Sequence, residues 1–570
     1  MSHLLTLHDP AAAREHYLSG VWQADTMYAL LHRHATERGA AHALRDSTRR
    51  LSWSALAQWV DAVAADLHDA GLRRGDRVAI WLPSRLEAVI VELACSRNGY
   101  VCNPSLHQNY TTAEIVSLLA RTEARALFAQ QGWGADASSP ARSGPSPDAL
   151  SADIFTRATA LGHMKRVYAL APLRKPEMQL PPGARAMPAP GQKPALPLPP
   201  QRTNPDQIVY IAFTSGTTGT PKAVMHSDNT LLANGRAMIA DWRVTPETIL
   251  LSHSPVSHHI GTVAVVQALV AGCELVLFDA TAGVSALDWI VATGATYVMG
   301  VPTHAMDILK EVDRRGLERL GAVRAFYMAG APIPSETARK LLALGAKPQN
   351  VYGMTENGSH NYTKPNDSVD VITGTCGKAC TGYEIKLWNA ENPDLEAAAG
   401  EVGEIGGRGG LLMLGYFDNQ SATESSFNGS GWFLSGDLGR LDEQGNLEIV
   451  GRKKDLIIRG GHNIYPAHIE EYAHRHPQVL KAAAFGVPDE RLGEKVCLAI
   501  IDRGTPPSAD EMLQHLARQG LSKFDMPEFY IAVAEFPLTA SGKILKRELV
   551  EWVKSGRLEP AAVRYREGPR

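Results

Sequence analysis

The chain has 570 residues, which is too long for one hydrophobic core and predicts two to four domains. Its hydrophobic content of 44% and charged content of 21% are those of an ordinary globular protein. The net charge of −3 gives no support to binding of nucleic acid or of an anionic membrane, and no run of about 18 apolar residues predicts a transmembrane helix.

The cysteines and the N-terminal residues favour a cytoplasmic location. No CxxC pair occurs, and Cys376 and Cys380 have no second pair nearby, so we expect free thiols in a reducing compartment. The first residues, MSHLLTLHDPAAAREHYLSG, carry charged side chains and contain no apolar core of the signal-peptide type. We therefore expect no integral membrane association. The sequence leaves open whether the protein is a monomer or a homodimer.

Helix and strand patterns alternate near the N-terminus. Residues 55–70 have apolar side chains at helical spacing, with Gly71 at the C-terminal end. A buried strand at 76–83, a helix at 84–98 and a short strand at 100–104 follow. This alternation predicts an α/β sheet. From about 133 to 205 the sequence is dense in proline and has little periodicity, so we expect a long connection there, with a proline-rich partner motif as the alternative.

A strand followed by a loop of small residues stands at the centre of the chain. Residues 208–213 form an apolar run rich in β-branched side chains. The next nine residues, 214–222, contain five hydroxyls, two glycines and one lysine but no carboxylate. Glycine lets backbone N–H groups approach a ligand closely, so this loop suits a polyphosphate. It is not a P-loop, since two residues separate Gly219 from Lys222, and a flexible linker is the alternative.

A second α/β unit is expected after this loop. A helix at 228–240 precedes predicted strands at 249–255, 274–278, 295–301, 322–330 and 350–353, which favour a doubly wound sheet. His253, His258 and His259 lie close in sequence, but no matched carboxylate or cysteine supports a metal site. Glycine and turn residues across 400–450 predict an antiparallel β segment. The last 120 or so residues have the size of one small α+β domain.

Four further stretches contain chemically useful side chains. Residues 351–357, VYGMTEN, end a predicted strand, so Tyr352 and Glu356 are expected where α/β ligands bind, although a Tyr-Gly turn before a helix is common. Residues 431–437 place an aspartate after a glycine turn, and an ordinary hairpin turn is the alternative. Residues 451–463 carry a run of basic side chains that is also typical of a solvated face. Residues 537–543 present Lys543 after a Ser-Gly turn, where a plain surface lysine is the alternative.

Taken together, these five stretches resemble the adenylate-forming superfamily, which contains acyl-CoA synthetases, luciferase and adenylation domains. The motifs occur in family order over about 210–547. The stretches at 222–232, 329–332 and 352–358 are similar to acid–CoA ligases, such as cyclohexanecarboxylate–CoA ligases and medium-chain acyl-CoA synthetases. The resemblance implies two doubly wound α/β subdomains and a distorted β-barrel subdomain in an N-terminal domain, 1–453. A small mobile α+β domain, 454–570, would follow, with its hinge at Lys454.

The resemblance also implies a reaction. A carboxylate would attack the α-phosphate of ATP to give acyl-AMP and pyrophosphate, and coenzyme A would then displace AMP. Thr355 would contact the α-phosphate, Glu356 would bind Mg²⁺, and Lys543 would reach the α-phosphate in the first step. Tyr352 would stack on adenine, and Asp437 would hold the ribose hydroxyls with Arg452 nearby. The loop residues Thr214, Ser215, Gly216, Thr217, Thr218, Gly219 and Lys222 would contact the phosphates.

The remaining implied positions surround the substrates. Gly330, Ala331, Pro332, Gly353 and Met354 would belong to the ATP and AMP site. The acyl pocket would be lined by His258, Val301, Ala329 and Gly330, and the coenzyme A tunnel by Gly460 and Gly461. The expected substrate is a medium-chain, alicyclic or aromatic acid. An acyl-AMP ligase that loads a carrier protein and a catalytically inactive acyl- or nucleotide-binding protein are the alternatives.

Overall fold

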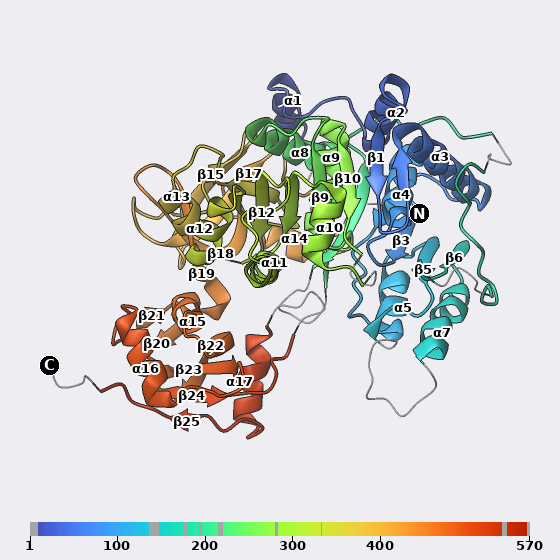
Figure 1. Ribbon diagram of the computed structural model, residues 1–570. Coiled ribbons are helices and arrows are strands. Elements are labelled where there is room, and N and C mark those ends of the chain that lie inside the picture. The colour runs from blue at the N-terminus through green and yellow to red at the C-terminus, as the bar shows by residue number, and fades with distance from the viewer. Residues whose placement is uncertain are drawn as a thin grey trace. The chain divides into compact units, whose positions relative to one another are not determined.

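The computed structural model describes residues 9–135, 147–174, 179–192, 197–214, 221–279, 283–331, 333–538 and 544–566 (Figure 1). For residues 147–152 it describes the backbone but not the side chains. Its contacts divide the chain into two units. Unit 1 contains residues 1–384 and 408–425, and unit 2 contains residues 385–407 and 426–570. The domain boundary expected at 453/454 lies inside unit 2 and stays a prediction.

The larger sheet of unit 1 has the strand order β15-β14-β13-β12-β11-β9-β10-β1-β2. The strands from β13 to β1 run parallel, while β14, β15 and β2 are added antiparallel at the two edges. Their bounds are β1 His42–Arg45, β2 Arg50–Ser52, β9 Ile249–Ser252, β10 Glu274–Leu277, β11 Tyr297–Gly300, β12 Ala325–Ala329, β13 Lys347–Met354, β14 Gly358–Tyr362 and β15 Lys378–Ala379.

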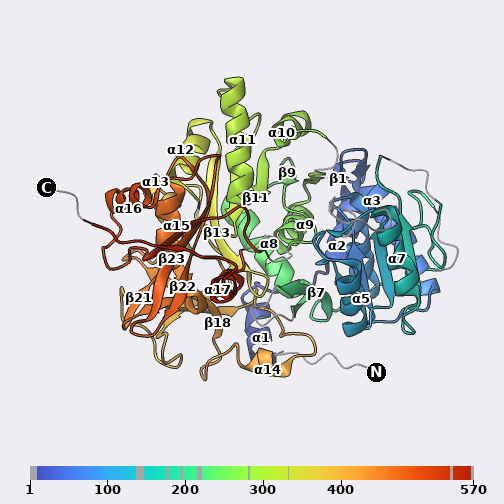
Figure 2. The same cartoon turned by 90° about the horizontal axis from the view of Figure 1, so that it is seen from below.

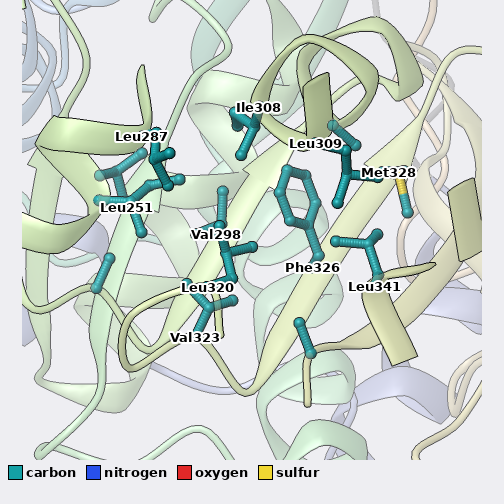
Figure 3. Packing of buried hydrophobic residues seen from close by; sticks show 14 of the residues in the cluster. Leu251, Leu287, Val298, Ile308, Leu309, Leu320, Val323, Phe326, Met328 and Leu341 are labelled. Atoms are coloured by element: carbon teal, nitrogen blue, oxygen red, sulfur yellow. The ribbon is translucent and has the colours of Figure 1, made fainter. Parts of the chain in front are cut away.

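Helices cover both faces of this sheet, as expected for a doubly wound unit. In Figure 2 the strands β9, β11 and β13 lie between α8 and α9 on one side and α10, α11 and α12 on the other. On the face covered by α10, α11 and α12, a hydrophobic cluster that includes Leu251, Val298, Phe326 and Leu341 packs between the helices and the sheet (Figure 3). The bounds are α8 Asp228–Trp242, α9 His259–Ala271, α10 Ala286–Thr293, α11 Pro302–Arg315, α12 Ser335–Ala343, α13 Val369–Gly374 and α14 Gln420–Glu424.

The smaller sheet of unit 1 has the order β6-β5-β3-β4-β7-β8 and is parallel except for its last pair. The predicted helix at 55–70 is confirmed as α3, which ends before Gly71 with φ +81°. The bounds are α1 Pro10–Leu18, α2 Met27–Glu37, α3 Trp53–Asp69, β3 Arg77–Trp81, α4 Leu86–Asn98, β4 Val101–Asn103, α5 Thr112–Arg121, β5 Ala126–Gln130, α7 Pro147–Thr159, β6 Arg166–Leu170, β7 Ile208–Thr214 and β8 Lys222–Ser227.

The stretch 133–205 is not one uninterrupted connection, because α7 and β6 lie within it. The composition of the whole stretch hid β6, RVYAL, in which the four residues after Arg166 are buried. The proline-rich part that follows β6 leads to Arg202 and then to β7. The predicted strand before the small-residue loop is confirmed as β7, and the loop joins β7 to its antiparallel partner β8.

Most residues of the antiparallel sheet β16-β17-β18-β19 belong to unit 2, which also holds an α+β sheet of order β21-β20-β23-β24-β25, with β22 beside β23. The α/β fold class is confirmed. The bounds are β16 Tyr383–Trp388, β17 Gly403–Gly409, β18 Phe433–Leu441, β19 Leu447–Arg452, the 3₁₀ turn Lys453–Asp455, β20 Ile457–Arg459, β21 His462–Ile464, α15 Pro466–His474, β22 Val479–Asp489, β23 Gly493–Asp502, α16 Ala509–Arg518, β24 Phe529–Ala532, α17 Lys546–Lys554 and β25 Ala561–Ala562.

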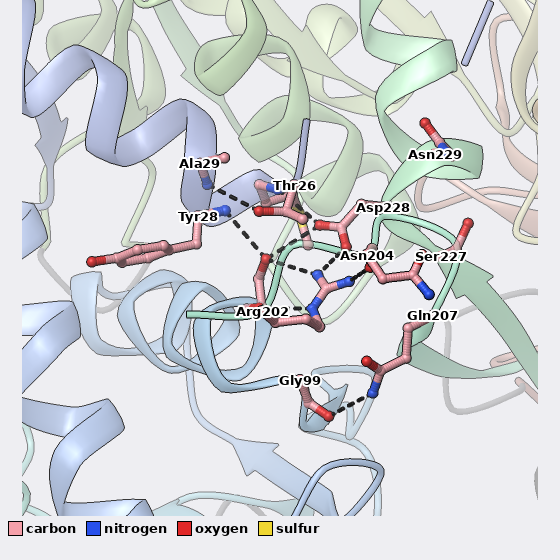
Figure 4. A network of polar contacts seen from close by, with 12 residues as sticks. Thr26, Tyr28, Ala29, Gly99, Arg202, Asn204, Gln207, Ser227, Asp228 and Asn229 are labelled. Carbon is pink, nitrogen blue, oxygen red and sulfur yellow. Dashed lines mark hydrogen bonds and ion pairs between the residues drawn. The ribbon is translucent and has the colours of Figure 1, made fainter. Parts of the chain in front are cut away.

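A buried ion pair joins the end of the proline-rich stretch to the start of α8. The side chains of Arg202 and Asp228 are fully buried, and Figure 4 shows the guanidinium pointing at the carboxylate. Arg202 also donates through Nε to the carbonyl of Ser96 at 3.0 Å. Asp228 accepts from the backbone N–H of Met27 at 2.8 Å. Four segments of the chain therefore meet at one pair of charges next to β8.

Replacing Arg202 with Met should lower the free energy of unfolding by about 3–5 kcal/mol, because the buried Asp228 carboxylate loses its cation. Urea unfolding followed by tryptophan fluorescence measures this change. The matched control is Lys310→Met, which removes the cation of an exposed pair with Asp307 and should cost about 1 kcal/mol or less. Equal stability of the two variants would contradict the importance of the buried pair.

Candidate active site

The two ends of the small-residue loop are paired across the hairpin. Thr214 at the end of β7 stands opposite Lys222 at the start of β8, and the Thr214 hydroxyl donates to the Lys222 carbonyl at 3.4 Å. Arg121 donates to the carbonyl of Pro221 at 2.5 Å. Of the residues predicted to contact phosphates, Ser215, Gly216, Thr217, Thr218 and Gly219 lie outside the described residues. The residues that flank the loop are thus fixed by hydrogen bonds on both sides.

Residues 413–417 connect β8 to the segment that contains Glu356. Phe417 N–H donates to the carbonyl of Ala223 at 2.7 Å, and Met225 and this segment exchange two further backbone hydrogen bonds. At its other end, Met413 N–H donates to the carbonyl of Glu356 at 2.7 Å. The chain that leaves the loop and the chain that carries the predicted metal ligand are therefore tied to the same short segment.

Tyr416, within this segment, contacts two predicted site residues. Its hydroxyl donates to Oε1 of Glu356 at 2.9 Å, and the Nζ of Lys222 lies 4.6 Å from the centre of its ring. Glu356 is 8% exposed. A carboxylate with the Thr355 hydroxyl next to it in sequence is a donor set that fits Mg²⁺, which prefers oxygen ligands. The structure thus brings Lys222 and Glu356 together around one aromatic ring.

The turn after β13 has a fixed backbone. A Cβ on Gly353 would lie 1.8 Å from the carbonyl oxygen of Gly358, so only glycine fits there. The side chain of Asn357 accepts from the N–H of Met354 at 3.1 Å, a local side-chain to backbone bond that closes the turn. The ring of Tyr352 is buried and meets His360 edge-on at 5.1 Å. This turn holds Thr355 and Glu356 at the carboxyl end of a parallel strand, where ligands of α/β sheets bind.

His226, at the end of β8, supports the same turn. Its Nε2 lies 2.7 Å from the carbonyl oxygen of Thr355, and its Nδ1 lies 2.9 Å from the hydroxyl of Thr230. A carbonyl only accepts, so Nε2 carries the proton and Nδ1 accepts from Thr230. Burial lowers the pKa of His226 to about 4, so the ring is neutral at pH 7.

A small cavity lies between α8 and α9 in unit 1. Its polar lining is formed by His226, Thr230, Asn234 and His259, and its apolar lining includes Leu231, Val263 and Val266. The Tyr210 hydroxyl lies 3.3 Å from Nδ1 of His259, and burial lowers the pKa of His259 to about 3. The sequence gives no signal for this cavity, because the helical spacing of its lining residues is equally typical of core packing.

The predicted acyl-pocket residues lie outside this cavity lining. His258 precedes α9 and stacks on His107, with the ring centres 4.3 Å apart. Ala329 ends β12, and a Cβ on the exposed Gly330 would lie 3.9 Å from Val301. The structure therefore places Val301 beside Gly330. Ala331 is exposed, and Pro332 lies outside the described residues.

The histidine metal site gains no support. Among the described residues, no group of three or more His, Cys, Asp and Glu side chains could hold a metal ion. His253 packs against Phe278 and His304, whereas His258 and His259 have the partners given above. The three histidines are thus neighbours in sequence with separate surroundings. Among all the residues that the structure describes, no helix combines the length and apolar character needed to cross a membrane.

The remaining predicted residues belong to unit 2. Asp437 in β18 stands opposite Arg452 in β19, with 3.5 Å between Oδ1 and Nε. Asp437 lies within a strand, not in the hairpin turn that was the alternative. Lys454 lies in the 3₁₀ turn after β19. Gly460 and Gly461, with φ of +58° and +83°, form the tight turn between β20 and β21. Lys543 lies outside the described residues.

Two positioning contacts were not predicted from the sequence. Tyr416 lies in the 403–417 stretch, whose pattern indicates only turns and strands, and nothing local links it to Glu356 sixty residues earlier. Glu404 accepts from Gly436 N–H at 3.2 Å and pairs with Lys453 at 2.7 Å, on either side of the Asp437–Arg452 pair. The order of residues along strands gives no signal for either contact.

The free energy of unfolding should fall as the pH decreases from 6.5 toward 4. Burial lowers the pKa of five histidines to about 3 or 4, namely His107, His226, His253, His259 and His360. Near pH 5 their counterparts in the unfolded chain are protonated, so the unfolded state binds more protons and stability rises with pH. Each contributes up to about 1.4 kcal/mol per pH unit in this range.

Urea midpoints measured from pH 7 to pH 4.5 give this slope. His259→Gln should reduce the slope by up to one proton. A stability independent of pH in this range would show that the buried rings are not neutral in the folded state.

Comparison with known proteins identifies two matching family models. The AMP-binding enzyme model matches residues 31–417, and the model of the AMP-binding enzyme C-terminal domain matches residues 468–543. The chain is similar to the medium-chain fatty-acid–CoA ligase of Escherichia coli (strain K12), with 30% identity over 519 residues, 86% of this chain and 83% of that protein.

Two further likenesses have comparable coverage. The human mitochondrial medium-chain acyl-CoA ligase ACSF2 is 30% identical over 546 residues, which are 90% of this chain and 85% of the relative. Among solved structures, ATP-bound MatB from Rhodopseudomonas palustris has a TM-score of 0.75 and 28% identity, covering 93% of this chain and 99% of that one.

Proposed function

The chain belongs to the AMP-binding enzyme family, and on this premise we propose that it joins a medium-chain carboxylic acid to coenzyme A with cleavage of ATP to AMP and pyrophosphate. It is an AMP-forming acid–thiol ligase, in agreement with the resemblance drawn from its motifs. The observation that carries the proposal is the arrangement of Lys222 and Glu356 around Tyr416. A cation and a carboxylate able to hold Mg²⁺, close to each other at the end of a parallel strand, suit a bound triphosphate.

The first step is an attack of one anion on another. A carboxylate oxygen of the acid forms a bond to the α-phosphorus of ATP, and the bond from that phosphorus to the bridging oxygen of pyrophosphate breaks. Such a reaction depends on alignment and charge neutralisation more than on proton transfer. Lys222 would neutralise the outer phosphates, and Thr355 would contact the α-phosphate. Mg²⁺ held by Glu356 would add positive charge there.

Other residues would bind the adenosine part of ATP and neutralise the charge on the α-phosphate. Tyr352 would contact adenine. Asp437, with Arg452 nearby, would bind the ribose, because a carboxylate accepts hydrogen bonds from ribose hydroxyls. Lys543 would bring an ammonium group to the α-phosphate. At ~4 Å, such a charge is worth roughly 4 kcal/mol at an effective dielectric of about 20.

In the second step the thiolate of coenzyme A attacks the acyl carbonyl, and AMP leaves with the electrons of the acyl–oxygen bond. The step needs no β- or γ-phosphate, so Lys222 and Glu356 have no role in it. We propose that Lys454 is the hinge of a rearrangement between the steps and that Gly460 and Gly461 line the path of coenzyme A. Residues without bulky side chains suit a narrow path.

The class of acid is proposed from the curated relatives. Both curated relatives named above are medium-chain ligases. The acyl chain would lie in the predicted pocket at His258, Val301, Ala329 and Gly330. One methylene group in such a pocket changes binding by only about 1–3 kcal/mol, so neighbouring chain lengths should overlap as substrates.

A screen of AMP release over acids of different length and shape tests the proposed function. Fatty acids of six to twelve carbons should give AMP and an equal amount of acyl-CoA when coenzyme A is present, with alicyclic and aromatic acids of similar size as secondary substrates. Pyrophosphate exchange without any thioester product would favour a carrier-protein acceptor instead. No AMP release and no exchange with any acid would contradict the proposed function and favour a binding protein.

A further inference from the structure

Tyr416 makes two contacts that the proposed reaction has not used. The hydroxyl group touches the carboxylate of Glu356 at 2.9 Å, and the ring face carries the ammonium group of Lys222 at 4.6 Å. A phenol hydroxyl that donates to a carboxylate fixes the direction of that carboxylate. An ammonium group over a ring face is held by the ring quadrupole. One side chain therefore restrains two groups of opposite charge.

The backbone around Tyr416 is fixed on both sides. Tyr416 N–H donates to the hydroxyl of Thr423 at 2.9 Å, and Tyr416 pairs with Val224 of β8 in an isolated bridge. Phe417 and Met413 add the hydrogen bonds to Ala223 and Glu356 described above. The residue is only 5% exposed. Because the backbone of Tyr416 is fixed and its ring is buried, the ring has little freedom to move. The side chains of Lys222 and Glu356 therefore take their orientation from it.

We propose that Tyr416 is a positioning residue that sets the direction of the Lys222 ammonium group and of the Glu356 carboxylate before ATP binds. The proposal rests on the proposed function. Without the hydroxyl, the Glu356 carboxylate would lose a hydrogen bond that fixes its direction toward the metal. Without the ring, Lys222 would lose its platform as well. Tyr416 acts through these two groups and takes no part in bond making.

Two substitutions separate the two contacts. Tyr416→Phe removes the hydroxyl and keeps the ring, whereas Tyr416→Leu removes both. The matched control is Tyr362→Phe, because the Tyr362 hydroxyl also donates to a carboxylate at 2.9 Å, that of Asp241, away from the proposed site. Thermal midpoints of all variants identify any general loss of folding, and Tyr416→Phe keeps the test decisive if Tyr416→Leu does not fold.

The measurement is the affinity for ATP by isothermal titration calorimetry, with Mg²⁺ and with EDTA. Tyr416→Phe should weaken binding of ATP with Mg²⁺ about tenfold or more, since a hydrogen bond to a charged group is lost. Its binding in EDTA should stay within about twofold of the unmodified protein. Tyr416→Leu should weaken binding under both conditions. For both variants pyrophosphate exchange should fall, while thioester formation from supplied acyl-AMP should stay within about twofold.

Two results would overturn the inference. One is a Tyr416→Phe protein whose ATP affinities match those of Tyr362→Phe under both conditions. The other is an equal loss of both half-reactions in Tyr416→Phe, which would indicate a merely structural role. If the unmodified protein bound no ATP and catalysed no pyrophosphate exchange, the proposed function itself would fail. An active unmodified protein with an unaffected Tyr416→Phe would reject only the role of Tyr416.

Discussion

The backbone pairing between β8 and residues 413–417 is the constraint on which the candidate site depends. β8 is the last strand of the smaller sheet, so one of its edges would otherwise have unpaired backbone groups. Residues 414–417 satisfy that edge, and Met413 reaches the carbonyl of Glu356. Three segments that lie far apart in the sequence, at 222–226, 354–356 and 413–417, are thereby fixed together by main-chain hydrogen bonds, which do not depend on particular side chains.

Neutral polar groups continue this framework into the interior. His226 of β8 donates through Nε2 to the carbonyl of Thr355, and its Nδ1 accepts from the hydroxyl of Thr230. A neutral ring suits this position, because a second proton would place an unpaired charge among buried groups. Between β8 and the turn at 354–356, the charges are thus concentrated on Lys222 and Glu356, whereas His226 and Thr230 are uncharged. This separation leaves the cation and the carboxylate available for a phosphate ligand and a metal ion.

Local patterns predicted the frame of the molecule well. The apolar spacing of 55–70, the β-branched run at 208–213 and the alternation after residue 228 all correspond to elements of the structure. The motif stretches also predicted the family, since each carries its chemistry within a few consecutive residues. β6 was hidden by the proline-rich composition around it, and the hairpin partner of β7 was not expected, because small polar residues in a loop say nothing about the strand that follows.

The contacts that position the site could not be predicted from the sequence. Tyr416 and Glu356 are sixty residues apart, and His226 is 129 residues from Thr355. Such contacts depend on the register of the sheets and on the path of the loops. The periodicity of a single segment predicts neither property. The predicted roles of Asp437, Arg452, Lys454 and Lys543 follow from the resemblance alone and stay predictions.

Activation of the acid as an adenylate is tested most directly with a substrate labelled by ¹⁸O in both carboxylate oxygens. If a carboxylate oxygen attacks the α-phosphate and coenzyme A then attacks the acyl carbon, one labelled oxygen must leave with AMP and the other must stay in the thioester. Mass spectrometry of AMP from a reaction with labelled octanoate should show one ¹⁸O atom in each molecule. Unlabelled AMP, or label found in inorganic phosphate, would contradict the adenylate route.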